Sequence, residues 1–201
     1  VCFSPSGSML LTSSFDSTAK LWSLPSGLCT HTLSGHRKPL FSAQFSPDGN
    51  SLVTASGDCT AKFWSSSSGE CLQTLLGHQD AVYCVAYSPL GNMVVTASFD
   101  TTARLWGSAV QDKRQQEMLT DHGPLLGECA HKLEGHNGPV YWVAFSPDAE
   151  VVATASRDST ARIWNCLSGD CLHILEGHRA LIYSANFSAD GELVVTASGD
   201  H

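Results

Sequence analysis

Residues 35–64 read GHRKPLFSAQFSPDGNSLVTASGDCTAKFW, and this stretch decides the fold. It holds three apolar runs of strand length, at 40–45, 51–56 and 60–64. Ser-Pro-Asp-Gly follows the first run and Gly-Asp follows the second, and these residue types favour tight turns. A fourth run comes at 71–75. The stretch therefore predicts one sheet of four short antiparallel strands.

The same pattern returns along the chain with a period of 42 residues. Asp16, Asp58 and Asp100 are 42 positions apart, and so are Asp158 and Asp200. Gly-His pairs begin at residues 35, 77, 135 and 177, so only the interval after the second pair is longer. A constant period of this length is typical of arrays of small units, each of which buries its apolar face against its neighbours.

The Gly-His pairs divide the chain into repeats, which we expect to form one domain over residues 1–201. The expected units are a partial repeat at 1–34, complete repeats at 35–76, 77–134 and 135–176, and a partial repeat at 177–201. The repeat at 77–134 carries a polar insertion at about 107–122, between its third and fourth strands. Two interpretations of the insertion stay open: a solvated loop, or a contact that is specific to this protein.

The repeated residues resemble those of the WD40 repeat family over essentially the whole chain. The resemblance rests on the Gly-His pairs, on Ser-Pro turns beginning at residues 4, 46, 88 and 146, and on Trp22, Trp64, Trp106 and Trp164, each after an apolar residue. The Asp that gives the family half its name is replaced after each Trp, by Ser23, Ser65, Gly107 and Asn165. The resemblance implies an all-β fold, a β-propeller of four-stranded antiparallel blades. About five repeats are present, three complete and two partial, which implies a segment of a seven-bladed ring.

Composition narrows the classes of function. The net charge of −8 disfavours direct binding to nucleic acid or to an anionic membrane surface. No apolar stretch is long enough to cross a bilayer.

Four of the eight cysteines occupy one slot of the repeat in separate units, so we expect free, buried side chains at strand positions. These are Cys29, Cys71, Cys129 and Cys171. Free cysteines in such number indicate a reducing, intracellular compartment, cytoplasmic, nuclear or both.

Each complete repeat contains a His, a Ser and a Thr, an Asp and a Trp. Such a set could be taken for a hydrolase triad, but a triad is needed once and this set recurs three times. We therefore predict that the chain is not an enzyme and that the set is a structural hydrogen-bond network. Which of the two hydroxyls in each repeat joins the network is left open. The predicted residues are His36, Thr54, Ser56, Asp58 and Trp64, then His78, Thr96, Ser98, Asp100 and Trp106, then His136, Thr154, Ser156, Asp158 and Trp164.

Metal and cofactor sites are not predicted. Cys-x-His pairs occur at Cys29, Cys129 and Cys171, but they fall in separate repeats, and a structural zinc needs four ligands. The sequence holds no phosphate-binding glycine loop, paired carboxylates or nucleotide motif. We expect no catalytic residue, no metal, no cofactor and no small-molecule substrate.

Function is expected on a surface. The resemblance implies that partners bind the face that bears the His loops and the Asp turns, at positions that vary between repeats. The predicted partner-binding residues are Phe15, Phe41, Tyr83, Phe99, Tyr141, Arg157 and Tyr183. Aromatic rings and arginine are the side chains that anchor protein interfaces. The alternative is that the rings only fill the mouth of the channel.

These observations favour a non-catalytic scaffold for protein–protein interaction that assembles multiprotein complexes. One alternative is a substrate- or peptide-recognition subunit of a ubiquitin ligase or of a chromatin complex. Another is the non-catalytic part of a larger enzyme. Aromatic rings on a net acidic body suit a basic peptide as the partner.

Overall fold

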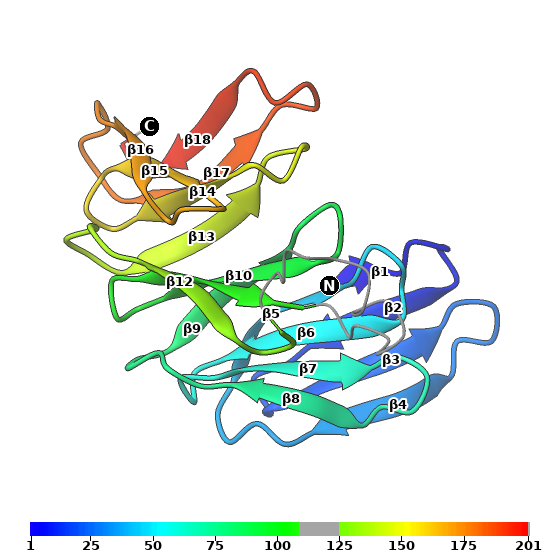
Figure 1. The fold of residues 1–201 in the computed structure, drawn as a ribbon. Helices are drawn as coiled ribbons and strands as arrows, with labels where there is room; N and C mark the ends of the chain where they lie inside the picture. Colours follow the sequence, from blue (N-terminus) through cyan, green and yellow to red (C-terminus); the bar gives the residue numbers. More distant parts are fainter. Residues whose placement is uncertain (109–124, 201) are drawn as a thin grey trace.

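The computed structural model describes residues 1–108 and 125–200, and every regular element within these ranges is a β-strand (Figure 1). The first sheet holds β1 (Cys2–Phe3), β2 (Met9–Ser13), β3 (Thr18–Ser23) and β4 (Cys29–Ser34). The second holds β5 (Leu40–Phe45), β6 (Ser51–Ser56), β7 (Ala61–Ser65) and β8 (Cys71–Leu75). The third holds β9 (Val82–Tyr87), β10 (Met93–Ser98), β11 (Ala103–Gly107) and β12 (Cys129–Leu133). The fourth holds β13 (Val140–Phe145), β14 (Val151–Ser156), β15 (Ala161–Asn165) and β16 (Cys171–Leu175), and the fifth holds β17 (Ile182–Phe187) and β18 (Val194–Ser198).

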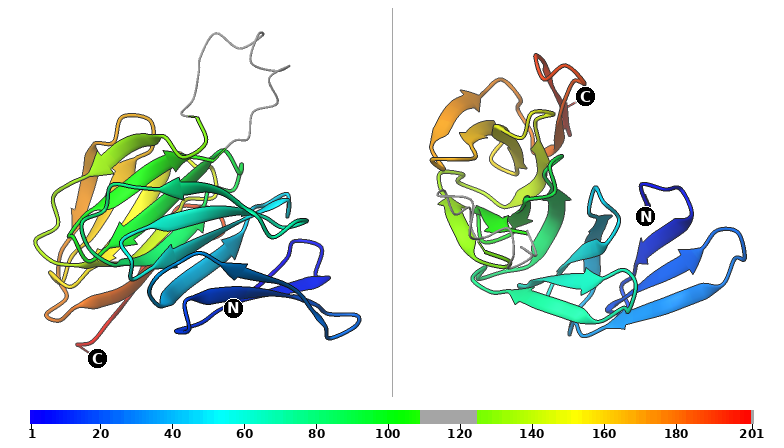
Figure 2. Two further views of the ribbon diagram at one scale, coloured as in Figure 1. Left: turned by 90° about the horizontal axis from the view of Figure 1, so that it is seen from below. Right: turned by 45° about the vertical axis from the view of Figure 1, so that its right-hand side comes forward.

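All neighbouring strands within a sheet are antiparallel and consecutive in sequence. The five sheets follow one another along an arc, as both views of Figure 2 show. The first strand of each sheet lies on the inner side, where β5 contacts β9, β9 contacts β13 and β13 contacts β17. This arrangement confirms the prediction of an all-β chain built of propeller-type blades.

The hydrophobic core lies between the sheets rather than inside any of them. Trp64 of the second sheet packs in one cluster with Leu11 and Leu21 of the first. Likewise Phe63 of the second sheet packs with Val85 of the third. Trp64 is 1% exposed, and burying a ring of its size removes about 200 Å² from water, which contributes ~5 kcal/mol as an upper estimate. A sheet without its neighbours would lose this contribution, which is why the repeat works only as an array.

The junction between the second and third sheets also has polar ties. The Tyr87 hydroxyl lies 3.0 Å from the Ser51 hydroxyl, and the Tyr87 amide donates to Gln44 Oε1 at 2.6 Å. The equivalent positions of the second, fourth and fifth sheets hold Phe45, Phe145 and Phe187, which have no hydroxyl.

The inner strands surround a cavity of about 470 Å³. Its lining comes from all five sheets and includes Cys2, Gln44, Cys84, Trp142 and Asn186. The inner ends of the sheets therefore converge on one central space.

The prediction of buried cysteines in the repeated slot is wrong. All eight cysteines are free, but Cys29, Cys71 and Cys171 are exposed and Cys129 is only half-buried. The slot is the first residue of the outermost strand of each sheet, where no further strand covers the side chain. The buried cysteines are Cys84, on an inner strand, and Cys166.

Most of the expected insertion at 107–122 lies outside the described residues. Its first position, Gly107, ends β11 and bridges to Leu126, and the Gly127 amide donates to the Gly107 carbonyl at 2.8 Å. The two sides of the insertion are thus held together at its base. The described residues contain no helix that is long and apolar enough to cross a membrane.

Candidate functional site

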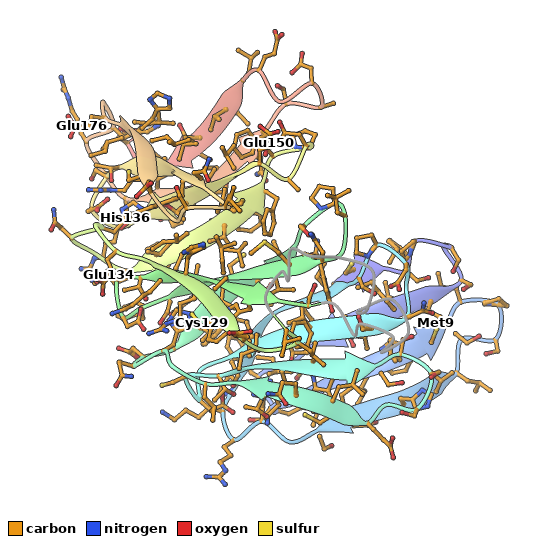
Figure 3. The ribbon with its side chains drawn as sticks, in the orientation of Figure 1. Met9, Cys129, Glu134, His136, Glu150 and Glu176 are labelled. Atoms are coloured by element: carbon orange, nitrogen blue, oxygen red, sulfur yellow. The ribbon has the colours of Figure 1, made fainter. Side chains whose placement is uncertain are left out.

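The loops between sheets and the turns at the Asp residues lie at the same end of the sheets, which we call the histidine face. The other end, which we call the opposite face, carries the turns after each inner strand and the hairpins between third and fourth strands. Figure 3 shows Glu134, His136 and Glu176 at the histidine face and Glu150 at the opposite face. The predicted His, Asp and partner-binding residues lie at this face, the predicted Thr and Ser lie on the second strand below it, and each predicted Trp lies near the other end of the third strand, with its indole N–H directed back to the Thr.

One buried network occupies this end of the second sheet. His36 Nδ1 lies 2.9 Å from Asp58 Oδ2, and His36 Nε2 lies 2.8 Å from Thr54 Oγ1. The Trp64 indole N–H donates to the same Thr54 oxygen at 2.9 Å. The network thus joins the loop before β5 to β6, to the turn after β6 and to β7.

The third and fourth sheets contain the same network with nearly identical geometry. The distances from His Nδ1 to Asp Oδ2 are both 2.8 Å, those from His Nε2 to Thr Oγ1 are 2.8 and 2.7 Å, and those from Trp Nε1 to Thr Oγ1 are both 2.9 Å. The groups are His78, Thr96, Asp100 and Trp106, and His136, Thr154, Asp158 and Trp164.

The positions of the protons in each network follow from whether the groups at its two ends donate or accept hydrogen bonds. An ionised carboxylate only accepts and an indole N–H only donates. His36 therefore donates from Nδ1 to Asp58 and accepts at Nε2 from the Thr54 hydroxyl, whose oxygen accepts from Trp64. This chain requires a neutral imidazole, and every polar group in it has a partner.

Burial and hydrogen bonding hold these protonation states. Burial raises the pKa of Asp58, but hydrogen bonds from Thr60, from the Arg37 amide and from His36 outweigh it and lower the pKa to about 2. The pKa of Asp158 is lowered to about 2 in the same way, and that of Asp100 is also lowered. Burial lowers the pKa of His36 and His136 more than the neighbouring carboxylates raise it.

The structure assigns different partners to the two hydroxyls that the sequence left open. Ser56 does not bond to His36, because its hydroxyl donates to the Lys38 carbonyl at 2.9 Å and accepts from the Asp58 amide at 3.1 Å. Ser98 and Ser156 make the equivalent bonds, to the Asp80 and Gly138 carbonyls.

A further network residue was missed from sequence. The Thr60 hydroxyl donates to Asp58 Oδ1 at 2.6 Å, and the Thr60 amide donates to the same oxygen at 3.1 Å. Thr102 and Thr160 do the same for Asp100 and Asp158. A Thr two positions after each Asp was visible in the repeat, and this recurrence was the signal for its role.

The outer sheets contain parts of the network. In the first sheet, Trp22 Nε1 donates to Thr12 Oγ1 at 3.0 Å. In the fifth sheet, His178 bonds to Thr196 at 2.8 Å and to Asp200 at 3.0 Å. The fifth sheet as described has no third strand to supply a Trp, so Thr196 keeps only its histidine partner.

The network has no reactive group free for a substrate. Thr54, Thr96 and Thr154 are fully buried, and each hydroxyl already serves both a His and a Trp. Within the described residues, no three His, Cys, Asp or Glu side chains are grouped closely enough to hold a metal ion.

Five of the predicted partner-binding residues form one continuous surface, which we call the aromatic ridge. Phe41 and Tyr83 stack with ring centroids 4.5 Å apart and planes 6° from parallel. Tyr83 also contacts Phe99 at 5.6 Å and Tyr141 at 5.5 Å, and Phe15 meets Phe41 edge-on at 5.9 Å. Phe15 is 74% exposed and the other four rings are half-buried. The ridge crosses four sheets.

Two predicted residues lie beyond the end of the ridge. Arg157 is exposed on the fourth sheet, and its amide donates to the Pro139 carbonyl at 2.9 Å. Tyr183 is on the fifth sheet, is 59% exposed, and stacks on no other described aromatic ring. Of the ridge rings, Phe41 also lines the central cavity.

A model of the family described as "WD domain, G-beta repeat" (WD40) matches five segments of the chain. The matched segments are residues 1–23, 27–65, 69–107, 127–165 and 169–201.

Similar curated proteins match over much shorter stretches. The F-box-like/WD repeat-containing protein TBL1Y of Homo sapiens is 51% identical over 37 residues, which are 18% of this chain and 7% of that protein. Transcription initiation factor TFIID subunit 5 of Drosophila melanogaster is 43% identical over 51 residues, 25% of this chain and 7% of that protein. The LST8 homolog of Dictyostelium discoideum is 47% identical over 38 residues, 19% of this chain and 12% of that protein. Each match therefore covers a small part of the relative's length, about one repeat.

Proposed function

The chain belongs to the WD40 repeat family, and on that basis we propose that it is a non-catalytic scaffold that binds protein partners through the aromatic ridge. The observation that carries the proposal is the contrast within one face. The network residues satisfy one another below the surface, whereas the five ridge rings keep part of their area exposed to water. Half-buried aromatic rings held by stacking lose little conformational entropy when a partner covers them.

The relatives' names support a role in complexes in general terms. One is named as a subunit of a transcription initiation factor and another as an F-box-like protein. Substrate recognition within a ubiquitin ligase or a chromatin complex is the finer form of the proposal, and an enzyme would need a catalytic part beyond these repeats. The free cysteines favour an intracellular location.

The double variant Tyr83→Ala/Tyr141→Ala tests the ridge. We expect affinity purification from cell lysate, quantified by mass spectrometry, to lose the partners that the wild-type chain captures, because two aromatic anchors are removed. The melting temperature should fall only slightly, because both rings are half-buried and keep no hydrogen bond in the network.

The matched control is Leu72→Ala/Leu172→Ala, which removes two exposed apolar side chains from the outermost strands β8 and β16. This control should capture the same partners as the wild type. Equal loss of stability and of partners in the tyrosine variant would identify the rings as structural plugs. Retained partners in a stable tyrosine variant would remove the ridge as the binding surface.

A further inference from the structure

The charged residues are divided between the two ends of the sheets. Of the 11 Lys and Arg residues, Lys113 and Arg114 lie outside the described ranges. The other nine all lie in the loops and turns of the histidine face or in the adjoining halves of the strands. The opposite face has no described cation but eight carboxylates: Asp48, Glu70, Glu128, Asp148, Glu150, Asp170, Asp190 and Glu192.

This division changes what the net charge of −8 means for a partner. The described carboxylates of the histidine face also number eight, against its nine cations: Asp16, Asp58, Asp80, Asp100, Glu134, Asp158, Glu176 and Asp200. The excess negative charge of the described residues therefore belongs to the opposite face. A partner that approaches the ridge meets a surface that is close to neutral. The negative electrostatic potential of the molecule is concentrated at the opposite face, so an anion is repelled there and not at the ridge.

The carboxylate oxygens of the complete networks are already occupied by internal hydrogen bonds, so they keep their charge but offer few lone pairs for direct contact with a cationic ligand. Asp58 accepts at Oδ2 from His36 and the Arg37 amide, and at Oδ1 from the amide and hydroxyl of Thr60. Asp100 and Asp158 accept the same four bonds. The exposed carboxylates in the loops and turns near the ridge are Asp16 and Asp80, and each already accepts from a neighbouring amide.

Exposed cations flank both ends of the Phe41–Tyr83–Tyr141 part of the ridge. Lys38 lies beside Phe41, since a Cβ placed on Gly57 would be 3.6 Å from Lys38 Cβ and 3.3 Å from the Phe41 ring. Arg157 lies beside the loop that leads into Tyr141, since a Cβ on Gly138 would be 3.3 Å from Arg157 Cβ.

Two more exposed cations extend these ends: Arg37 precedes Lys38, and Arg179 lies in the loop before β17. Among the described residues, none of these four side chains is within ion-pair distance of a carboxylate. Their positive charges are therefore available to a ligand.

We propose that the aromatic ridge binds an acidic peptide segment, with aromatic or aliphatic side chains at its centre and Asp or Glu at both ends. The central side chains would pack on Phe41, Tyr83 and Tyr141, while the flanking carboxylates would meet Lys38 at one end and Arg157 at the other. Two ring steps of 4.5 and 5.5 Å separate Phe41 from Tyr141, so an extended segment of about six residues reaches both ends. This inference rests on the proposed function, because it names the partner of the same ridge.

A peptide fits these observations better than a nucleic acid. A polynucleotide carries a charge at every step along its backbone and would need a continuous cationic track. Here the cations stand in two groups with apolar rings between them, and Asp80 lies in a loop between the two groups. The arrangement matches carboxylates that are spaced by an apolar centre.

Three hexapeptides of the same design test the inference by fluorescence anisotropy with the full chain. Each has a central Trp-Phe pair, and the four flanking residues are all Glu, all Gln or all Lys. We expect the Glu peptide to bind about tenfold more tightly than the Gln peptide at 50 mM salt, and this advantage to shrink at 300 mM salt. The Lys peptide should bind most weakly of the three.

Charge reversal at one flank supplies the matched pair of variants. Arg157→Glu should remove most of the advantage of the Glu peptide over the Gln peptide. Lys132→Glu makes the same change of charge on β12, away from the ridge, at a side chain paired with Glu134, and should leave the advantage within about twofold of its wild-type value. Circular dichroism melts of both variants confirm that they are folded.

The outcomes separate this inference from the proposed function. Equal binding of the three peptides, with loss of all three in Tyr83→Ala, would overturn the acidic preference and leave the ridge as a binding surface. No binding of the Glu peptide, or tighter binding of the Lys peptide, would also overturn the acidic preference. A single-stranded ten-nucleotide oligonucleotide that binds as tightly as the Glu peptide, and is equally weakened by Arg157→Glu, would replace the peptide with a nucleic acid.

Discussion

The buried networks and the aromatic ridge are built from the same loops and turns, yet they have opposite relations to their surroundings. In the network of the second sheet, the side chains of His36, Thr54 and Asp58 all form hydrogen bonds with other groups of the protein. In the ridge, Phe41 and Tyr83 use one side of each ring for stacking and leave the rest partly exposed. The comparison teaches that the constant positions of the repeat spend their polar groups on internal hydrogen bonds, whereas the variable positions of the same segments keep part of their surface exposed to solvent.

The largest expected effect is loss of a network carboxylate. Asp58→Ala removes the acceptor of four hydrogen bonds, which leaves the buried His36 ring without its carboxylate and the exposed Arg37 amide without its acceptor. We expect the free energy of unfolding to fall by about 1–3 kcal/mol. Urea denaturation followed by tryptophan fluorescence measures the change.

Asp200→Ala is the matched control for this variant. Asp200 makes the equivalent bonds to His178 and the Arg179 amide, but in a network without a Trp and at a more exposed site. Its loss should therefore cost less than that of Asp58. An equal cost at both positions would show that closure of the network by Trp64 adds nothing, and an unchanged midpoint for Asp58→Ala would remove the network as a stabilising element.

A smaller effect is expected from acid. The pKa of His36 and of His136 is lowered on folding, so the unfolded chain binds more protons as pH falls below about 6.5, the ordinary histidine value. The histidine contribution to stability is present above that pH and is lost progressively below it. The carboxylates add a second loss as pH falls from about 3.8 towards 2, because the pKa of Asp58 and Asp158 is also lowered.

Thermal melts between pH 7 and pH 5 measure the first of these losses. In the double variant His36→Gln/His136→Gln, the fall in melting temperature over this range should be smaller than in the wild type, because neither side chain titrates. A fall of the same size in both proteins would assign the acid sensitivity to groups outside the networks.

The smallest effect is expected from the ridge. Phe15→Ala removes a ring that is 74% exposed and touches Phe41 by one edge, so the free energy of unfolding should change by no more than about 0.5 kcal/mol. Urea denaturation measures this change alongside that of Asp58→Ala. A loss comparable with that of Asp58→Ala would erase the distinction between network and ridge.

Much of the fold could be predicted because each repeat contains the same turn-forming residues between the same apolar runs. The strands at 40–45 and 51–56 have the predicted bounds, since the Ser-Pro-Asp-Gly and Gly-Asp turns fix where the first ends and where the second begins and ends. The strand at 71–75 also has the predicted bounds, whereas the third strand, predicted at 60–64, lies at 61–65. The burial of the cysteine slot could not be predicted, because an apolar strand pattern does not say which strand is outermost. Cys71 begins the fourth strand, and no further strand covers it.

The site was predictable at the level of residue types but not of partners. Thr54 and Ser56 point to the same side of β6, since side chains alternate along a strand, so periodicity alone does not choose between them. The pairing of Leu52 with Trp64 brings the indole within reach of Thr54, and Ser56 lies one step further towards the loop. The net charge is a single total, so it does not show that the charges are separated between the two faces. The position of each charged residue within the repeat does carry this information.

The outermost strand of each sheet has a consequence for how the array opens. β8 pairs only with β7, and the amides along its outer edge have no strand of the same sheet to receive them. Opening in solution should therefore begin at outer strands such as β8 and β16, and their amide protons should exchange with deuterium long before those of β6 or β10, which lie between two strands. Each sheet would then have a direction of opening, with protection rising from its outermost strand towards its second and third strands.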